Sequence, residues 1–186
     1  MKLPNKFQAD FNPGVLDMMF QRLKETKWPD IIGEDSWVYG VPRTWLQEMV
    51  DFWVSEWNWA KISDEINQWD NYLVEIDGIP IHYLHAPGRG PNPKPIVLTH
   101  GWPWTFWDFK DVIGPLSDPE KYGGNPEDSF DVYVPSLPGF TFSTPLTHSD
   151  VDVRRVAELW NTLMTDVLGH DRFCAHGGDW GGSGYS

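Results

Sequence analysis

The stretch that most constrains the fold is Gly177-Gly178-Asp179-Trp180-Gly181, which follows a short apolar segment at residues 172–176. It has the pattern Gly-x-nucleophile-x-Gly of a sharp turn from a strand into a helix, with aspartate at the nucleophile position. The central residue of such a turn is strained, and glycines two positions away leave room for the two elements to approach. The pattern predicts that the turn presents the Asp179 carboxylate at the start of a helix.

An aspartate at this position predicts a particular chemistry. The helix dipole and the free backbone N–H groups of a helix N-terminus favour the ionised form of Asp179. Attack of a carboxylate on an ester carbonyl gives an anhydride, whereas attack on an sp3 carbon with a leaving group gives an ester that water can cleave. Epoxides and alkyl halides contain such carbons, so they are the substrate classes that the motif favours.

A second motif, His100-Gly101-Trp102-Pro103, directly follows the apolar segment at residues 95–99. In α/β-hydrolase folds, the loop after the third strand supplies one half of the oxyanion hole. The order and placement of the two motifs therefore agree with a single site at the ends of two strands.

From residue 72 onward, strand and helix patterns alternate. Two strands, 72–76 and 79–84, are joined by Asp77-Gly78, which is a strong signal for a two-residue hairpin. A helix at 153–167 carries one apolar stripe and has Gly169 where a C-cap is expected. The other expected elements are strands at 95–99, 131–135 and 172–176 and a helix near 105–113. The alternation implies an α/β fold with a mostly parallel sheet and crossover helices.

The first 70 residues have helical patterns instead. We expect helices around residues 15–23, 42–57 and 60–69, and seven of the 12 tryptophans lie in this segment. Tryptophans at helical spacing bury large areas, so packing against another surface is the favoured interpretation. An aromatic cage or a carbohydrate platform is the alternative.

The net charge of −13 is spread along the chain, which makes nucleic acid and anionic membrane surfaces poor partners. No run of about 18 apolar residues and no secretory leader pattern occurs, so we expect a soluble, cytoplasmic protein. The single cysteine, Cys174, lies in the apolar segment before the turn. It is expected to be buried in the core, in a reducing compartment.

Three motifs and the Trp-rich segment before them closely resemble the epoxide hydrolases of the α/β-hydrolase superfamily. The motifs are His100-Gly101-Trp102-Pro103, the segment 134–143 and Gly177-Gly178-Asp179-Trp180-Gly181. The long N-terminal segment resembles the branch related to the microsomal enzyme. The resemblance implies an N-terminal helical segment at 1–70, or to about 105, that wraps around the core and its lid. It is followed at 71–186 by the first half of an α/β-hydrolase core that ends just after the elbow.

The resemblance further implies Asp179 as the catalytic nucleophile and oxyanion-hole N–H groups from Trp102 and Trp180. Asp179 would open an epoxide while an acidic hydroxyl protonates the departing oxygen, and a His-activated water would then cleave the ester to a vicinal diol. The small-molecule partners are thus an epoxide and water. We also expect a cis Trp102-Pro103 peptide bond, as in this family, because a tight turn is needed to aim the Trp102 N–H at the point reached by that of Trp180.

The family takes its acid from two lid tyrosines and its water-activating histidine and carboxylate from the C-terminal half, all beyond Ser186. His100 and His176 flank the site, but structural hydrogen bonding is the favoured role of both. No cofactor is implied, and no His-x3-His or Cys-x2-Cys spacing predicts a metal site. We therefore expect residues 1–186 to be the N-terminal part of a longer enzyme. Alone, these residues should be inactive and poorly stable as a monomer. The C-terminal half of the fold, in the same polypeptide or as a second chain, would complete them.

Two alternatives stay open. A haloalkane dehalogenase also has an elbow aspartate followed by tryptophan, whose indole N–H binds the halide, so Asp179-Trp180 alone does not exclude it. The other alternative is a non-catalytic, truncated α/β-hydrolase that acts as a binding module. Association into a homo-oligomer is compatible with each of these interpretations.

Overall fold

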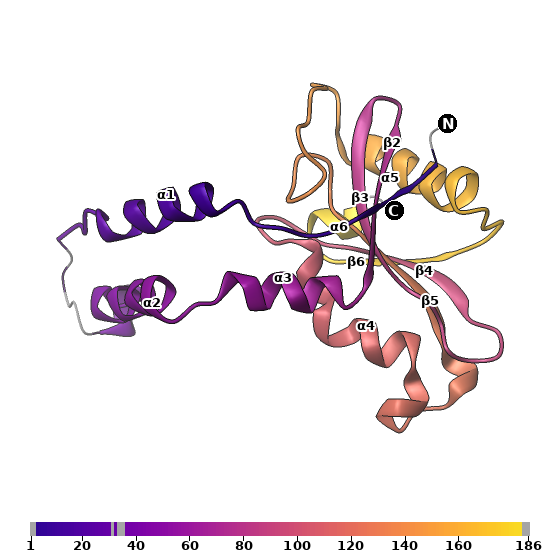
Figure 1. Cartoon of the computed structure of the whole chain (residues 1–186), viewed down its shortest axis with the longest axis horizontal. Coiled ribbons are helices and arrows are strands. Elements are labelled where there is room, and N and C mark those ends of the chain that lie inside the picture. The colour runs from indigo at the N-terminus through magenta and orange to yellow at the C-terminus, as the bar shows by residue number, and fades with distance from the viewer. Residues whose placement is uncertain (1–2, 31, 33–35, 184–186) are drawn as a thin grey trace. The chain divides into compact units, whose positions relative to one another are not determined.

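The computed structural model describes residues 3–30, 32 and 36–183, which form two compact units (Figure 1). The first unit contains the residues up to Gln8 and those from Ile66 on, and the second contains Ala9–Glu65. The expected end of the hydrolase segment, Ser186, lies outside the described residues.

The first unit is built on a sheet in which the described residues form six strands, in the order β1-β2-β3-β5-β4-β6. The strands are β1 Asn5–Phe7, β2 Asp70–Ile76, β3 Ile79–Ala86, β4 Lys94–Thr99, β5 Phe130–Pro135 and β6 Cys174–Gly177. β4 runs parallel to both β5 and β6, whereas β1, β2, β3 and β5 pair antiparallel in that order. The sheet is mixed, and its parallel pairs lie on the side that carries the elbow.

The β2–β3 hairpin forms where Asp77-Gly78 predicts it. Ile76 pairs with Ile79 across the turn, and both turn residues have positive φ, 51° at Asp77 and 80° at Gly78. Positive φ at both central positions is the type I′ geometry, whose twist matches that of the flanking strands. The hairpin is thus determined locally.

Helix α5, Val153–Thr162, covers one face of the sheet and continues as a π-helical turn at Leu163–Val167. Its apolar stripe packs on the buried side chains of β2, β3 and β4 and on Tyr133 of β5. The buried residues of the stripe are Leu159, Trp160, Leu163 and Met164. Gly169 follows with φ of 78°, which confirms the C-cap predicted there.

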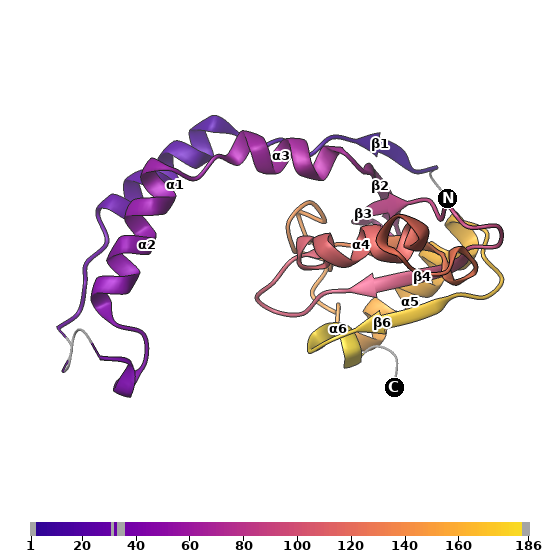
Figure 2. The same cartoon turned by 90° about the horizontal axis from the view of Figure 1, so that it is seen from below.

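Helix α4, Lys110–Ser117, lies on the opposite side of the sheet from α5 (Figures 1 and 2). A 3-10 turn at Phe106–Phe109 precedes α4, and together they bury Phe106 and Ile113. Because side chains alternate along a strand, Val97 of β4 joins the α5 core while its two neighbours point to the α4 side. Both faces of β4 are therefore buried, as a central parallel strand requires. Two further 3-10 turns follow α4, at Pro119–Tyr122 and Pro126–Asp128.

The second unit contains α1 Pro13–Lys24, a 3-10 turn at Trp37–Tyr39, α2 Arg43–Ser55 and most of α3 Trp59–Asn67. The Asn12 side chain caps α1 by accepting from the N–H groups of Gly14 and Val15. Aromatic rings contact one another within the unit, in the pairs Phe11–Trp59, Trp37–Trp45, Phe52–Trp57 and Trp57–Trp59. Neither α1 nor α2 contains a buried residue, however, so these rings do not form a closed core by themselves.

Two features differ from what the sequence led us to expect. Residues 5–7 lie in the segment described as helical, before the first of the three expected helices, but they form a strand that pairs antiparallel with β2, and the Phe7 ring packs against His82 and Phe142. Cys174 is exposed, not buried. The reason is the position of β6, which is the last strand of the sheet order and pairs with β4 alone among the described strands (Figure 2).

Candidate active site

The strand β6 passes into the short helix α6, Trp180–Ser183, through a sharp turn at Asp179. Asp179 has φ of 54°, a left-handed conformation that side-chain-bearing residues rarely adopt. The strained elbow predicted from the sequence is confirmed. Its strain places the carboxylate at the carboxyl end of the parallel strands, beside the end of β4.

Glycines make the close approach at the elbow possible. A Cβ on Gly177 would overlap the backbone of Gly181, and one on Gly181 would overlap the carbonyl oxygen of Thr99. A Cβ on Gly101 would lie 2.9 Å from Oδ1 of Asp179. Gly177 and Gly181 therefore allow the close approach that the sequence pattern predicted. Gly101 shows that the loop after β4 also depends on a glycine.

The Asp179 carboxylate accepts hydrogen bonds from the two backbone N–H groups predicted for the oxyanion hole. The Trp102 N–H donates to Oδ1 at 3.1 Å. Hydrogen bonds from the backbone N–H groups of Trp102 and Trp180 lower the pKa of Asp179 below its ordinary value. The structure thus brings together the three predicted site residues, and Asp179 is ionised at neutral pH.

The loop that carries the Trp102 N–H is held by His100. The His100 ring is only 2% exposed, and its Nδ1 lies 2.9 Å from the carbonyl oxygen of Gly101. Its Nε2 accepts from the N–H of Leu137 at 3.0 Å. Burial lowers the pKa of His100, so the ring is neutral. The predicted structural role of His100 is confirmed, and the Trp102-Pro103 bond is cis, as expected.

A cavity of about 470 Å³ opens beside Asp179. It is lined by Thr99, His100, Gly101, Trp104, Asp108, Phe109, His176, Gly178 and Asp179. Sequence reasoning missed Trp104 and Phe109, although both follow the His-Gly-Trp-Pro motif within a few residues. His176 is exposed toward this cavity, which does not fit the structural role expected for it. The cavity walls combine aromatic rings with the nucleophile.

A smaller apolar cavity of about 220 Å³ lies against the exposed indole of Trp180. Its lining comes from the segment after β5 and the start of α5: Leu137, Pro138, Phe140, Leu146, Val151, Asp152, Val153 and Val156. Apolar surface is thus available in the cavity beside Asp179 and against the neighbouring Trp180, an environment suited to an uncharged organic substrate.

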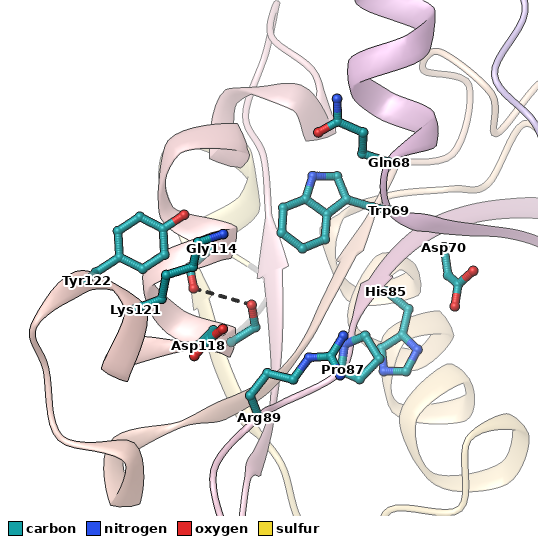
Figure 3. Close-up of a pocket in the computed structure, with 11 residues that line it drawn as sticks. Gln68, Trp69, Asp70, His85, Pro87, Arg89, Gly114, Asp118, Lys121 and Tyr122 are labelled. Carbon is teal, nitrogen blue, oxygen red and sulfur yellow. Dashed lines mark hydrogen bonds between the residues drawn. The ribbon is translucent and has the colours of Figure 1, made fainter.

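A third cavity, of about 330 Å³, is polar and lies elsewhere (Figure 3). Figure 3 shows Trp69, His85 and Arg89 on one side and Tyr122 and Lys121 on the other. Its residues come from the start of β2, the end of β3 and the loop after it, and α4 with the turn after it, at the end of the sheet where β4 and β5 begin. That is the end opposite Asp179, so this cavity is not part of the same site.

The buried imidazole of His82 does not belong to the site either. Its Nδ1 lies 2.9 Å from the Ser136 hydroxyl and its Nε2 lies 3.1 Å from Oδ1 of Asn71. Burial lowers the pKa of His82 to about 3. This ring is a neutral structural link between β2, β3 and the segment after β5.

Two protein-family models match the chain: "Epoxide hydrolase N terminus" over residues 4–109 and "alpha/beta hydrolase fold" over residues 94–184. A putative epoxide hydrolase of Stigmatella aurantiaca is 41% identical over 94% of this chain, and epoxide hydrolase 1 of Oryctolagus cuniculus is 29% identical over 94%. The chain covers 40% and 39% of these two proteins. It spans about two fifths of the length of the curated relatives that it matches.

Among solved structures, epoxide hydrolase from Aspergillus niger superposes with a TM-score of 0.82 and 28% identity, over 97% of this chain and 47% of that one. Juvenile hormone epoxide hydrolase from the silkworm Bombyx mori gives a TM-score of 0.82 at 24% identity, over 96% and 42%. The second likeness shows the fold alone. Among the described residues, no helix is long and apolar enough to cross a membrane.

Proposed function

The chain belongs to the epoxide hydrolase family with an α/β-hydrolase fold, and from this we propose that it supplies the nucleophile and the oxyanion hole of a site that converts an epoxide into a vicinal diol. The observation that carries the proposal is the Asp179 carboxylate at the elbow, which accepts from the backbone N–H groups of Trp102 and Trp180. The aromatic walls beside it fit an uncharged organic epoxide.

The reaction proceeds in two steps. Oδ1 of Asp179 is held by the Trp102 N–H, so Oδ2 attacks a ring carbon, the carbon–oxygen bond breaks and the departing oxygen takes a proton from an acid. Water then attacks the carbonyl carbon of the Asp179 ester and loses a proton to a base. The N–H groups of Trp102 and Trp180 stabilise the negative charge that develops on the carbonyl oxygen Oδ1. When this intermediate collapses, the bond to the alkoxy oxygen breaks, that oxygen takes back the proton held by the base, and the diol is released.

The acid and the base come from outside the described residues. Among these residues, the hydrogen bonds to the Asp179 carboxylate come from backbone N–H groups, and no histidine or tyrosine side chain bonds to it. We infer that a water-activating histidine with its carboxylate partner and the tyrosine acids are contributed by further sequence, in the same polypeptide or in a second chain. The polypeptide that carries all of these groups is called the catalytically complete protein below.

Isotope labelling of the catalytically complete protein tests the ester. In a single turnover in 18O-water, the label should enter the Asp179 carboxylate, and the diol should stay unlabelled, because water attacks the ester carbonyl. Label in the diol from the first turnover would replace this mechanism with direct attack of water on the epoxide.

Asp179→Asn is the matched variant, because it keeps the shape of the side chain and removes the nucleophile. It should form no covalent adduct and lose activity by roughly a thousandfold or more. Asp111→Asn, at an exposed position at the start of α4, serves as the control. A chloroalkane assayed in parallel separates epoxide opening from dehalogenation, since halide release without diol formation would favour the latter.

A further inference from the structure

Three hydrogen bonds lie in series behind the Asp179 carboxylate. The Leu137 N–H donates to Nε2 of His100 at 3.0 Å, Nδ1 of His100 lies 2.9 Å from the Gly101 carbonyl oxygen, and the Trp102 N–H donates to Oδ1 of Asp179 at 3.1 Å. The Gly101 carbonyl and the Trp102 N–H belong to one peptide group. His100 therefore contacts the group that binds the carboxylate, although it does not contact Asp179.

The partners determine which nitrogen of His100 carries the proton. A backbone N–H can only donate and a carbonyl oxygen can only accept, so Nε2 is the acceptor for Leu137 and Nδ1–H is the donor to Gly101. The buried ring also packs edge-on against Phe140, with centroids 5.4 Å apart. The two hydrogen bonds thus select the neutral Nδ1–H tautomer, and the contact with Phe140 restricts the orientation of the ring.

The geometry of a peptide group passes this restraint on. In a trans peptide, the C=O and N–H bonds point in opposite directions, so a donor that holds the Gly101 oxygen also fixes the direction of the Trp102 N–H. The three hydrogen bonds are donated in the same sense, from Leu137 to His100, from His100 to the Gly101–Trp102 peptide and from that peptide to Asp179. Hydrogen bonds in such a series polarise one another. The arrangement strengthens the Trp102 N–H as a donor and prevents the peptide from turning away.

We propose that His100 is a positioning residue that aims the Trp102 N–H at Oδ1 of Asp179, the oxygen that takes up negative charge during ester hydrolysis, and this inference rests on the proposed function. The two reaction steps should depend on it differently. Ester formation removes negative charge from the carboxylate, whereas ester hydrolysis places negative charge on the oxygen bound by this N–H. A weaker Trp102 donor therefore slows hydrolysis of the ester and does not slow its formation.

Two substitutions of His100 separate its two hydrogen bonds in the catalytically complete protein. His100→Asn places an amide N–H near the position of Nδ1, and His100→Gln places an amide oxygen near that of Nε2. Because His100→Gln loses the donor to Gly101, its ester hydrolysis should fall by roughly 10- to 100-fold, while ester formation changes by less than about threefold. His100→Asn should retain more of the hydrolysis rate.

The kinetic signature is an accumulating ester. In His100→Gln, kcat and KM should fall together. One equivalent of epoxide per site should be consumed rapidly before slow diol formation, and the Asp179 adduct should be visible by mass spectrometry. General damage to the site would slow both steps alike. Equal slowing of the two steps, or a smaller effect in His100→Gln than in His100→Asn, would overturn the proposal. His148→Gln, in an exposed loop far along the chain, is the matched control.

A second readout needs no turnover. Nitrogen NMR of the imidazole should show Nδ1 protonated and Nε2 unprotonated at neutral pH, and the carboxyl pKa of Asp179 should rise in His100→Gln relative to the wild type. An Nε2–H tautomer or an unchanged pKa of Asp179 contradicts the positioning role. If these signatures are present but no epoxide is opened, the proposed function fails and the positioning role stands. If diol forms but the signatures are absent, the positioning role of His100 fails and the proposed function stands.

Discussion

The imidazole of His82 is fully buried where β2, β3 and the segment after β5 meet, and it has ring contacts with Phe7, Phe106 and Phe142. Its pKa of about 3 lies below the value of about 6.5 for an unfolded chain. Between these values the unfolded state binds a proton that the folded state does not, so acid favours unfolding. His100, whose pKa is also lowered by burial, acts in the same direction.

We therefore predict that the free energy of unfolding decreases as the pH falls below 6.5, with a slope of up to about 1.4 kcal/mol per pH unit for His82 alone. Denaturant titrations at pH 7, 6, 5 and 4.5 measure this slope above the range in which most carboxylates titrate. His82→Gln should lower the stability at pH 7 and reduce the slope. An unchanged slope in this variant would show that His82 does not carry the effect.

At the residue scale, the elbow pattern predicted Asp179 as a nucleophile and the family resemblance implied Trp102 and Trp180, and all three lie inside short motifs that can be identified in the sequence. It did not find the His82 network, since Asn71 and Ser136 lie 11 and 54 positions away from the histidine. The burial of Cys174 was wrong for a related reason. An apolar strand sequence does not show whether a strand has neighbours on both sides.

At the element scale, the elbow depends on how closely α6 approaches the end of β4. A Cβ on Gly181 would overlap the Thr99 carbonyl oxygen and lie 2.7 Å from the carbonyl oxygen of His100. Both atoms are backbone and cannot move aside as a side chain can. We predict that Gly181→Ala lowers the free energy of unfolding by about 1–3 kcal/mol and displaces Asp179 from the Trp102 N–H.

Gly178→Ala is the matched control for this prediction. Gly178 lies in the same turn, but a Cβ there meets nothing within 4 Å. The free energy of unfolding of Gly178→Ala should stay within about 0.5 kcal/mol of the wild-type value, as for a tolerated surface substitution. Urea midpoints of the two variants compare them directly, and equal destabilisation would contradict a steric origin.

Elements with local signals could be predicted from the sequence, whereas their pairing could not. The hairpin at Asp77-Gly78, the α5 stripe and the Gly169 cap are local, and all are present. The strand at Asn5–Phe7 has three residues and forms only because β2 offers it an edge more than 60 positions away. The alternation of strand and helix patterns likewise predicted a mostly parallel sheet. The sheet is mixed instead, because the pairs β1–β2, β2–β3 and β3–β5 are antiparallel.

At the scale of the whole molecule, the two units differ in how they are stabilised. The helices α1, α2 and α3 have 12, 13 and 9 residues, and the side chains of Trp37, Val38 and Tyr39 are each more than 60% exposed. Helices of this length are marginal in water without tertiary packing. We predict that a peptide of residues 9–65 loses its helical circular dichroism gradually on heating, without a cooperative transition. A sharp transition at a concentration that keeps the peptide monomeric would refute this.

A second prediction at this scale concerns residues 1–186 as an isolated chain. The described site offers a nucleophile and two N–H donors to the substrate. We predict that a reactive epoxide adds to Asp179 at most once and that no sustained diol production follows, because the ester is not hydrolysed. Intact-mass spectrometry and a diol assay measure both events, with Asp179→Asn as the control without adduct. Steady diol formation by the isolated chain would mean that its acid and base lie within these residues.

The strand β6, which pairs with β4 alone among the described strands, carries an exposed thiol that can serve as a chemical probe. Cys174 is the single cysteine of the chain, and it lies exposed on β6, five positions before the nucleophile. A maleimide therefore labels one known place, and its reaction rate measures how much of β6 is covered in any assembly that contains the chain. Thiol accessibility can thus report the coverage of β6 without a substrate, independently of whether the chemistry proposed for Asp179 occurs.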